Sequence, residues 1–193
     1  MQIQTVGIIG AGTMGNGIAQ ACATSGINVV MVDISEAAVQ KGLATVAGSL
    51  DRLIKKEKIS AADKEAALAK ITVSTDYSAL KAAQLVIEAA TENEALKIKI
   101  LQEVDALVGP EVLIASNTSS ISITKLAAVT GRADKFIGMH FFNPVPMMAL
   151  VEVIRGLQTS DATHAAVQAL AQQLGKTPIT VKNGPGFVVN RVL

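Results

Sequence analysis

The stretch TVGIIGAGTMGNGIAQ, residues 5–20, decides the fold that we expect for this chain. A short apolar run leads directly into a glycine-rich turn, and a segment with helical spacing of apolar residues follows. The turn has the pattern G-x-G-x-x-G and consists of Gly10, Ala11, Gly12, Thr13, Met14 and Gly15. In this pattern the first glycine makes the tight turn, the second lets the backbone approach phosphate groups, and the third lets the helix pack closely against the strand. The N–H groups at the helix N-terminus favour a negatively charged ligand, so the stretch predicts a phosphate-binding turn.

The next apolar run, INVVMV at 27–32, strengthens this interpretation because an acidic residue, Asp33, follows it. An acid at the end of the second strand, about 20 residues after such a turn, is typical of a dinucleotide site. The Asp33 carboxylate could accept hydrogen bonds from ribose hydroxyls and would repel a 2′-phosphate, which predicts NAD rather than NADP. The alternative is that Asp33 only caps the following helix or stabilises a turn.

Further along the chain, short β-branched runs alternate with Ala- and Leu-rich segments of helical period. The expected strands are 4–9, 27–32, 71–75, 84–88, 112–116 and 136–140. The expected helices are 14–25, 36–56, 61–70, 92–107 and 122–129. Repeated strand–helix–strand units predict an α/β fold, with a Rossmann-type, doubly wound and mostly parallel sheet covered on both faces. Two later strands, 149–154 and 177–181, flank an expected helix at 161–174 and should join the sheet as antiparallel additions.

Composition limits the classes of protein to which the chain could belong. It has 193 residues, 50% of them hydrophobic, and a formal net charge of +1 at pH 7. These values suit one core-bearing domain, and the balanced charge gives no reason to expect nucleic acid or an anionic membrane as a partner. The apolar region 136–154 is not expected to span a membrane because His140, Pro144 and Glu152 interrupt it. One cysteine, Cys22, and the lack of a basic N-terminal signal favour the cytoplasm, and we predict no bound metal.

The stretch GMHFFNPVPMMALVEVI, residues 138–154, holds the residues expected to carry chemistry. His140 falls at the carboxyl end of the sixth expected strand, where ligands bind in open α/β sheets. Its alternative role is a core histidine bonded to a nearby carbonyl. Glu152 lies in an apolar run, and buried charges are rarely found unpaired. A histidine held by a buried carboxylate is an oriented general base, which together with NAD indicates oxidation of an alcohol to a ketone, or the reverse.

A second polar segment, SNTSS at 116–120, should reach the same edge of the sheet. Of Ser119 and Ser120, we expect one to cap the helix that follows and the other to bind a substrate oxygen. Asn117 should lie beside the cofactor. Asn143 either forms a turn with Pro144 or helps to hold the reacting carbonyl or the nicotinamide.

Four segments together, GIIGAGTMGNGIAQ, SNTSSISIT, GMHFFNPVPMMALVEVI and NGPGFVVNRVL, closely resemble the L-3-hydroxyacyl-CoA dehydrogenase family, and in particular its bacterial short-chain members. The resemblance covers essentially the whole chain. It implies NAD-dependent interconversion of (S)-3-hydroxyacyl-CoA and 3-ketoacyl-CoA esters, with 3-hydroxybutyryl-CoA and acetoacetyl-CoA as the expected pair. The implied catalytic residues are the base His140, its partner Glu152, the substrate-binding Ser119 and Asn190.

The same resemblance implies further binding residues. Asn143, Glu92 and Lys97 match cofactor-site positions, the last two near the nicotinamide. Ser49 and Lys56 match positions that contact CoA, and their spacing of two helical turns puts them on one helix face. The neighbouring Lys55 and Lys58 are expected to be solvated lysines at a helix end.

The resemblance also implies how the chain is organised. Residues 1–183 should be the NAD-binding domain, and residues 184–193 a hinge and the first residues of a helical dimerisation domain that is otherwise absent. The full-length form is then expected to be a homodimer. Two other interpretations stay open: a hydroxyacid dehydrogenase related to 6-phosphogluconate dehydrogenase, and a protein with little activity, either an NAD-binding fragment or a structural relative like a lens crystallin.

Overall fold

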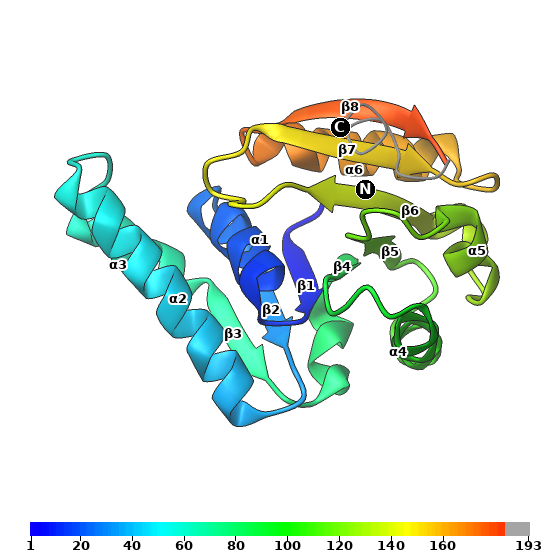
Figure 1. Cartoon of the computed structure of the whole chain (residues 1–193), viewed down its shortest axis with the longest axis horizontal. Coiled ribbons are helices and arrows are strands. Elements are labelled where there is room, and N and C mark those ends of the chain that lie inside the picture. Colours follow the sequence, from blue (N-terminus) through cyan, green and yellow to red (C-terminus); the bar gives the residue numbers. More distant parts are fainter. Residues whose placement is uncertain (184–193) are drawn as a thin grey trace.

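In the computed structural model, which describes residues 1–183, one eight-stranded sheet carries helices on both faces (Figure 1). The strand order is β3-β2-β1-β4-β5-β6-β7-β8. The strands are β1 (Thr5–Ile9), β2 (Asn28–Val32), β3 (Ile71–Ser74), β4 (Leu85–Glu88), β5 (Leu113–Ser116), β6 (Phe136–Phe141), β7 (Leu150–Arg155) and β8 (Thr177–Lys182). All residues of β4, β5 and β6 are buried, which is why these strands read as uninterrupted apolar runs.

The first six strands are parallel, and the last two run against them. β7 pairs antiparallel with β6, and β8 pairs parallel with β7. The expected antiparallel additions are therefore confirmed. In the register of β6 and β7, His140 lies directly opposite Glu152, so the side chains of these two residues project from the same face of the sheet.

Two helical layers cover the sheet. The α-helices are α1 (Thr13–Thr24), α2 (Glu36–Lys55), α3 (Ala61–Ala69), α4 (Glu94–Leu107), α5 (Ile123–Ala128) and α6 (Asp161–Gln173). One apolar core lies between the sheet and α1, α2, α3 and α6, and the other lies beneath α4, α5 and a short 3-10 helix, η1 (Tyr77–Ala82). Neither η1 nor η2 (Ala133–Lys135) was expected from the sequence, because such short turns have no helical period to detect.

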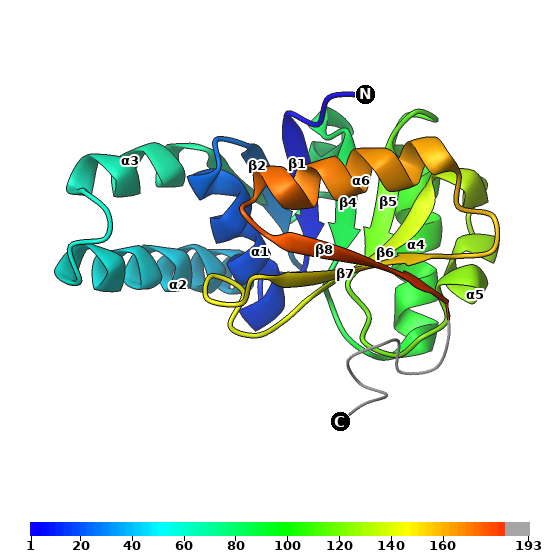
Figure 2. The same cartoon turned by 90° about the horizontal axis from the view of Figure 1, so that it is seen from above.

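Helices α2 and α3 lie side by side and project together beyond the sheet (Figure 2). α2 has 20 residues, and its fully buried positions are Val39, Gly42, Val46 and Leu50. Their spacing makes one apolar stripe, which Leu53 extends into the last turn of α2 as a partly buried residue packed against the core. Ser35 caps the start of α2, and a capping box of Ser60 and Asp63 starts α3.

No helix in the described part of the chain is long and apolar enough to cross a membrane.

Candidate active site

The candidate site lies where the strand order reverses. β1 is paired with β2 on one side and with β4 on the other. The segment after β1 leads into α1 on one face of the sheet, and the segment after β4 leads into α4 on the opposite face. A crevice forms at such a switch point, at the carboxyl ends of the strands. The glycine turn, the segment after β4, the segment after β5 and the end of β6 all meet at this edge.

The glycine turn has the geometry that its sequence predicts. Gly10 has φ +104°, which side chains rarely allow. A Cβ on Gly15 would lie 1.7 Å from the carbonyl oxygen of Gly10, so the third glycine permits the close approach of α1. A Cβ on Gly12 would meet nothing within 4 Å, which leaves open space in front of this backbone. Gly12 is also the N-cap of α1 and provides no side-chain cap, so the helix N-terminus faces that space.

Asp33 is tied to the glycine turn. Its Oδ2 accepts a hydrogen bond of 2.8 Å from the N–H of Ala11, and its Oδ1 accepts one of 2.6 Å from the N–H of Ile34. The N-cap of α2 is Ser35, so the alternative of Asp33 as a helix cap is wrong, although its bond to Ile34 does stabilise the local turn. Asp33, Gly10 and Gly12 line one cavity of about 430 Å³. A ribose and its phosphates would fit between the carboxylate and the glycine backbone, as the sequence predicts for NAD.

The predicted pair of His140 and Glu152 is in contact. Nδ1 of His140 lies 3.0 Å from Oε1 of Glu152, which is fully buried, and His140 is 7% exposed. The imidazole also lies against the ring of Phe142, with 4.5 Å between ring centroids. With its proton on Nδ1, the neutral imidazole would donate a hydrogen bond to the carboxylate, and Nε2 would be the basic nitrogen. His140 lines a cavity of about 270 Å³ at the strand ends, together with Met14, Glu92, Asn117, Ser119, Phe141, Phe142 and Asn143.

The segment after β5 is organised around Glu92, not around a helix cap. The hydroxyl of Thr118 donates to Oε2 of Glu92 at 3.1 Å, and those of Ser119 and Ser120 donate to the same oxygen at 3.3 and 3.4 Å. The N-cap of α5 is Ser122, so the prediction that Ser119 or Ser120 caps this helix is wrong. The hydroxyl oxygen of Thr118 accepts hydrogen bonds from the N–H groups of residues 120 and 121 and so stabilises the local turn. Ser119 and Ser120 then lie at the edge of the site.

Asn117, predicted to lie beside the cofactor, lines the His140 cavity and also holds two strands together. Its side-chain oxygen accepts a hydrogen bond of 2.8 Å from the N–H of Phe141. The amide therefore fixes the end of β6 next to the end of β5, where Ser116 stands. It holds His140, one residue before Phe141, at the mouth of the crevice.

Lys97 forms a buried ion pair that the sequence analysis did not find. Its ammonium lies 2.8 and 2.7 Å from the two carboxylate oxygens of Glu88, and both side chains are almost completely buried. Ser116 donates to Glu88 at 2.7 Å, and Lys97 lies 3.7 Å from Glu92. Lys97 thus joins the end of β4 to the half-exposed Glu92 carboxylate. The sequence holds one signal for this pair, because the apolar strand LVIE ends in an acid, Glu88, and a buried acid needs a partner.

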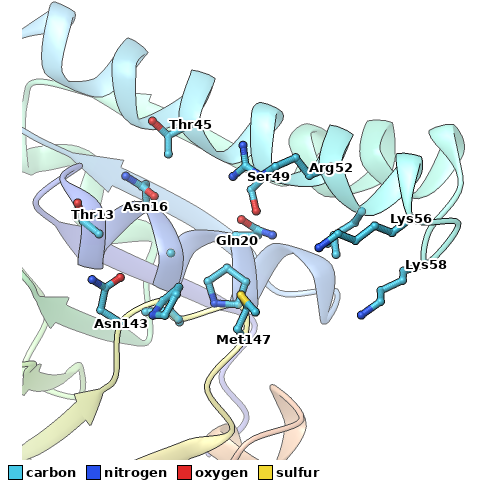
Figure 3. Close-up of a pocket in the computed structure, with 15 residues that line it drawn as sticks. Thr13, Asn16, Gln20, Thr45, Ser49, Arg52, Lys56, Lys58, Asn143 and Met147 are labelled. Atoms are coloured by element: carbon cyan, nitrogen blue, oxygen red, sulfur yellow. The ribbon is translucent and has the colours of Figure 1, made fainter.

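A third cavity, of about 680 Å³, lies between α1, α2 and the segment after β6 (Figure 3). Ser49 and Lys56, expected from the family resemblance, both line it, as does Asn143. Arg52 lines it too and escaped the sequence analysis, although it shares the helix face of Ser49 and Lys56. Lys58 also lines the cavity, against our expectation of a solvated helix end, whereas Lys55 does not.

Charge is distributed unevenly in this third cavity. Lys56 and Lys58 lie at one end of it and Thr13 and Asn143 at the other, while the side chain of Arg52 extends along α2 towards Ser49 (Figure 3). Asn143 also lines the cavity of His140, so the two cavities adjoin at the end opposite the lysines. The remaining predicted residue, Asn190, lies outside the described residues.

The glycine turn, the acid after β2 and the crevice at the switch point together define a dinucleotide-binding protein of the Rossmann type. The 3-hydroxyacyl-CoA dehydrogenase, NAD binding domain family matches residues 5–184, and the chain belongs to this family. Its cofactor is therefore NAD. The family resemblance seen in the sequence is confirmed, and the alternative of a 6-phosphogluconate dehydrogenase relative is set aside.

Several relatives are bacterial enzymes of one kind. The chain is 47% identical over 191 residues to 3-hydroxybutyryl-CoA dehydrogenase of Bradyrhizobium diazoefficiens. This match covers 99% of the present chain and 65% of the relative. It is 48% identical over 187 residues to a probable 3-hydroxybutyryl-CoA dehydrogenase of Deinococcus radiodurans, a match that covers 97% of the present chain and 67% of the relative. The crystal structure of (S)-3-hydroxybutyryl-CoA dehydrogenase from Ralstonia eutropha matches with a TM-score of 0.98 and 76% identity, over 99% of this chain and 68% of that one. The chain thus spans about two thirds of the length of these relatives.

Proposed function

We propose that the protein containing this chain interconverts (S)-3-hydroxyacyl-CoA and 3-ketoacyl-CoA esters, with 3-hydroxybutyryl-CoA and acetoacetyl-CoA as the preferred pair. The observation that carries the proposal is the contact of His140 with the buried Glu152, at the edge of the sheet where the glycine turn lies. The names of the relatives support the choice of substrate.

In this proposal His140 is the general base. Its Nε2 removes the proton of the 3-hydroxyl group, and in the reverse direction the imidazolium returns a proton to the ketone oxygen. Glu152 holds the imidazole by Nδ1 and stabilises the positive charge that develops on the ring. Bound NAD supplies the acceptor for the hydride that leaves C3 of the substrate, or the donor in reverse.

The same site offers groups to orient the reacting ester. Ser119 stands at the cavity of His140 and would bind the reacting oxygen or the thioester carbonyl, with Asn190 as the second proposed group. Glu92 and Asn143 line this cavity and would face the nicotinamide end of the cofactor. Lys97 would act on the cofactor only through Glu92, because its ammonium is committed to the buried Glu88.

The cationic end of the third cavity would hold the CoA phosphates. Arg52 and Lys56 lie on one face of α2, and Lys58 follows them. Arginine and lysine bind phosphate through charge-assisted hydrogen bonds. Ser49 would add a hydrogen bond, and the acyl chain would run along α1 past Asn143 towards His140.

Two further parts of the proposal concern the whole protein. The balanced charge and single cysteine support a cytoplasmic location. The resemblance to the dehydrogenase family supports a homodimer. Light scattering on the complete protein would test the oligomeric state, and a monomer at micromolar concentration would contradict it.

A kinetic comparison tests the proposed function. We expect acetoacetyl-CoA to drive oxidation of NADH, and free 3-keto acids of the same length to do so far more slowly. His140→Ala should lower turnover by at least roughly a hundredfold and leave NADH affinity within about twofold, because His140 lies outside the cavity of Asp33. Equal losses of turnover and NADH binding would show that His140 is structural, and turnover of free keto acids alone would refute the substrate class.

A further inference from the structure

The loop that joins β6 to β7, residues 142–149, forms one wall of the cavity proposed for acyl-CoA. Residues 143–147 all line that cavity. The loop has little apolar packing of its own, since Met147 is 78% exposed and Met148 40%. Val145 is the exception, at 2% exposed. Without another restraint, the outer part of this wall would have few contacts to hold its shape.

Val145 anchors the loop against the helix that follows the glycine turn. A Cβ added to Gly17 would lie only 2.9 Å from the Cβ of Val145, so this part of the loop sits directly on α1. α1 carries the backbone expected to bind the cofactor phosphates. The position of Val145 therefore fixes how the acyl-CoA wall lies relative to the cofactor side of the site.

Lys176 holds the same part of the loop from the opposite side. Its ammonium donates a hydrogen bond of 2.6 Å to the carbonyl oxygen of Val145 and one of 2.8 Å to that of Met148. These two carbonyls bracket Pro146 and Met147, which line the cavity. Next to the lysine, the N–H of Thr177 donates at 2.7 Å to the carbonyl of Ala149.

The environment of Lys176 suits this task. The side chain is partly buried, and this burial lowers the pKa of its ammonium below the usual range. Among residues 1–183, no ion pair joins Lys176 to a carboxylate, so backbone carbonyls are its recorded partners. Hydrogen bonds from a charged donor are stronger than neutral ones, which makes one ammonium enough to hold two points of a loop.

We propose that Lys176 is a positioning residue for substrate recognition. It clamps loop 142–149 between β8 and α1, and so holds the wall along which the acyl-CoA ester lies. This inference rests on the proposed function, because that function assigns the cavity to the ester. The clamp itself is a statement about the loop and can be tested without a substrate.

The first test measures the loop directly in the 193-residue chain. Lys176→Met keeps an unbranched apolar stem and removes the ammonium group with its charge. Hydrogen exchange of the backbone amides in 142–149 should accelerate by roughly tenfold, the equilibrium effect of losing charge-assisted hydrogen bonds. Lys182→Met, at an exposed lysine that ends β8, the strand beginning directly after Lys176, is the matched control and should leave the loop unchanged. Unchanged exchange in Lys176→Met would overturn the clamp.

The second test measures its consequence for binding. Titration calorimetry should show the affinity of Lys176→Met for acetoacetyl-CoA reduced by roughly tenfold. The affinity for ADP-ribose, which lacks the nicotinamide, should stay within about twofold, because no residue of loop 142–149 lines the cavity of Asp33. Lys176→Arg should restore most of the loss, because a guanidinium can also donate to two carbonyls. Parallel losses for both ligands would mean general destabilisation and would overturn the proposed role. If the unsubstituted chain binds NADH but not acetoacetyl-CoA, the proposed function and the role in substrate recognition both fail, while the exchange experiment still decides whether the clamp exists.

Discussion

At the scale of single residues, the proposed chemistry depends on a pair of side chains whose contact comes from strand register. His140 and Glu152 are twelve positions apart in sequence, yet the antiparallel pairing of β6 and β7 places them opposite each other. A carboxylate with no exposed surface is stable there only with hydrogen-bonding partners. The imidazole is one such partner, and the carboxylate in turn fixes the orientation of the ring. The contact therefore satisfies a buried charge and, in the proposed mechanism, also orients the general base.

Glu152→Gln separates these two contributions, because it preserves shape and removes charge. We expect turnover of acetoacetyl-CoA by the complete protein to fall by roughly a hundredfold or more, since the imidazolium formed in the reaction loses its stabilising partner. NADH affinity should change by less than about twofold. Glu65→Gln, an exposed acid on α3, is the control. A steady-state assay that finds kcat unchanged in Glu152→Gln would refute the dyad.

The buried pair of Lys97 and Glu88 makes a second prediction at this scale. Lys97→Met would leave the Glu88 carboxylate charged and without its cation inside the protein, which should lower the free energy of unfolding by about 3–5 kcal/mol. Adding Glu88→Gln should recover much of this loss, because the neutral amide needs no cation. Urea unfolding would measure both effects.

The exposed pair of Lys125 and Glu94 is the matched control for this prediction. Its contribution should be within about 1 kcal/mol, as for surface ion pairs generally. If Lys97→Met and Lys125→Met destabilise the chain equally, burial is not what makes the Lys97 pair matter.

At the scale of elements, the sequence predicted every strand and α-helix of the described residues, with ends within two residues. The apolar strands and the helical spacing of residues are local signals, so they can be read from one segment at a time. Site contacts follow a different rule. The bond from Lys97 to Glu88 joins α4 to β4, and Lys176 reaches a loop some thirty residues away. No periodicity records such contacts, which is why both escaped the sequence analysis.

Serine caps show the same limit on a smaller scale. Four serines lie within residues 116–122, and each is a plausible cap by composition. The structure selects Ser122, because Thr118 uses its hydroxyl to make the turn before α5. Ser119 and Ser120 are then directed to Glu92. Which serine serves the helix is decided by where the turn ends, and only the folded chain fixes that position.

The projecting end of α2 carries the prediction for this scale. Arg52→Gln and Lys56→Gln should each weaken the binding of acetoacetyl-CoA by roughly five- to tenfold, by loss of a charge-assisted hydrogen bond to phosphate. The effect should shrink as salt is added, because the site is open to solvent. Lys55→Gln lies on the same helix outside the cavity and should change affinity by less than about twofold. If calorimetric titrations find that Lys55→Gln weakens acetoacetyl-CoA binding as much as Arg52→Gln and Lys56→Gln do, the assignment of this cavity to CoA is wrong.

At the scale of the whole molecule, the larger cavities lie on opposite sides of the sheet along one edge. The cavity of Asp33 lies beside β4, η1 and α4, and the cavity of Arg52 lies between α1, α2 and loop 142–149. The two cavities share no lining residue, but a smaller cavity of about 240 Å³ beside the glycine turn borders both. Gly12 and Asp33 line it on one side, and Thr13, Asn16 and Thr45 line it on the other. His140 and Asn143 line the smaller cavity where the two ligands would meet. Under the proposed function, the remote ends of the two reactants would therefore occupy different cavities, and their reacting ends would meet beside His140.

This separation predicts independent binding of the two remote ends. ADP-ribose, which lacks the nicotinamide, and CoA, which lacks the acyl group, should each bind the 193-residue chain with an affinity that changes by less than about twofold when the other is saturating. Coupling should appear only when the reacting ends are present, as with NAD and acetoacetyl-CoA, because those ends would share the cavity of His140. Coupling free energies from paired titrations measure this directly. Competition between ADP-ribose and CoA would mean that one cavity serves both, and the assignment of the α2 face to CoA would then be wrong.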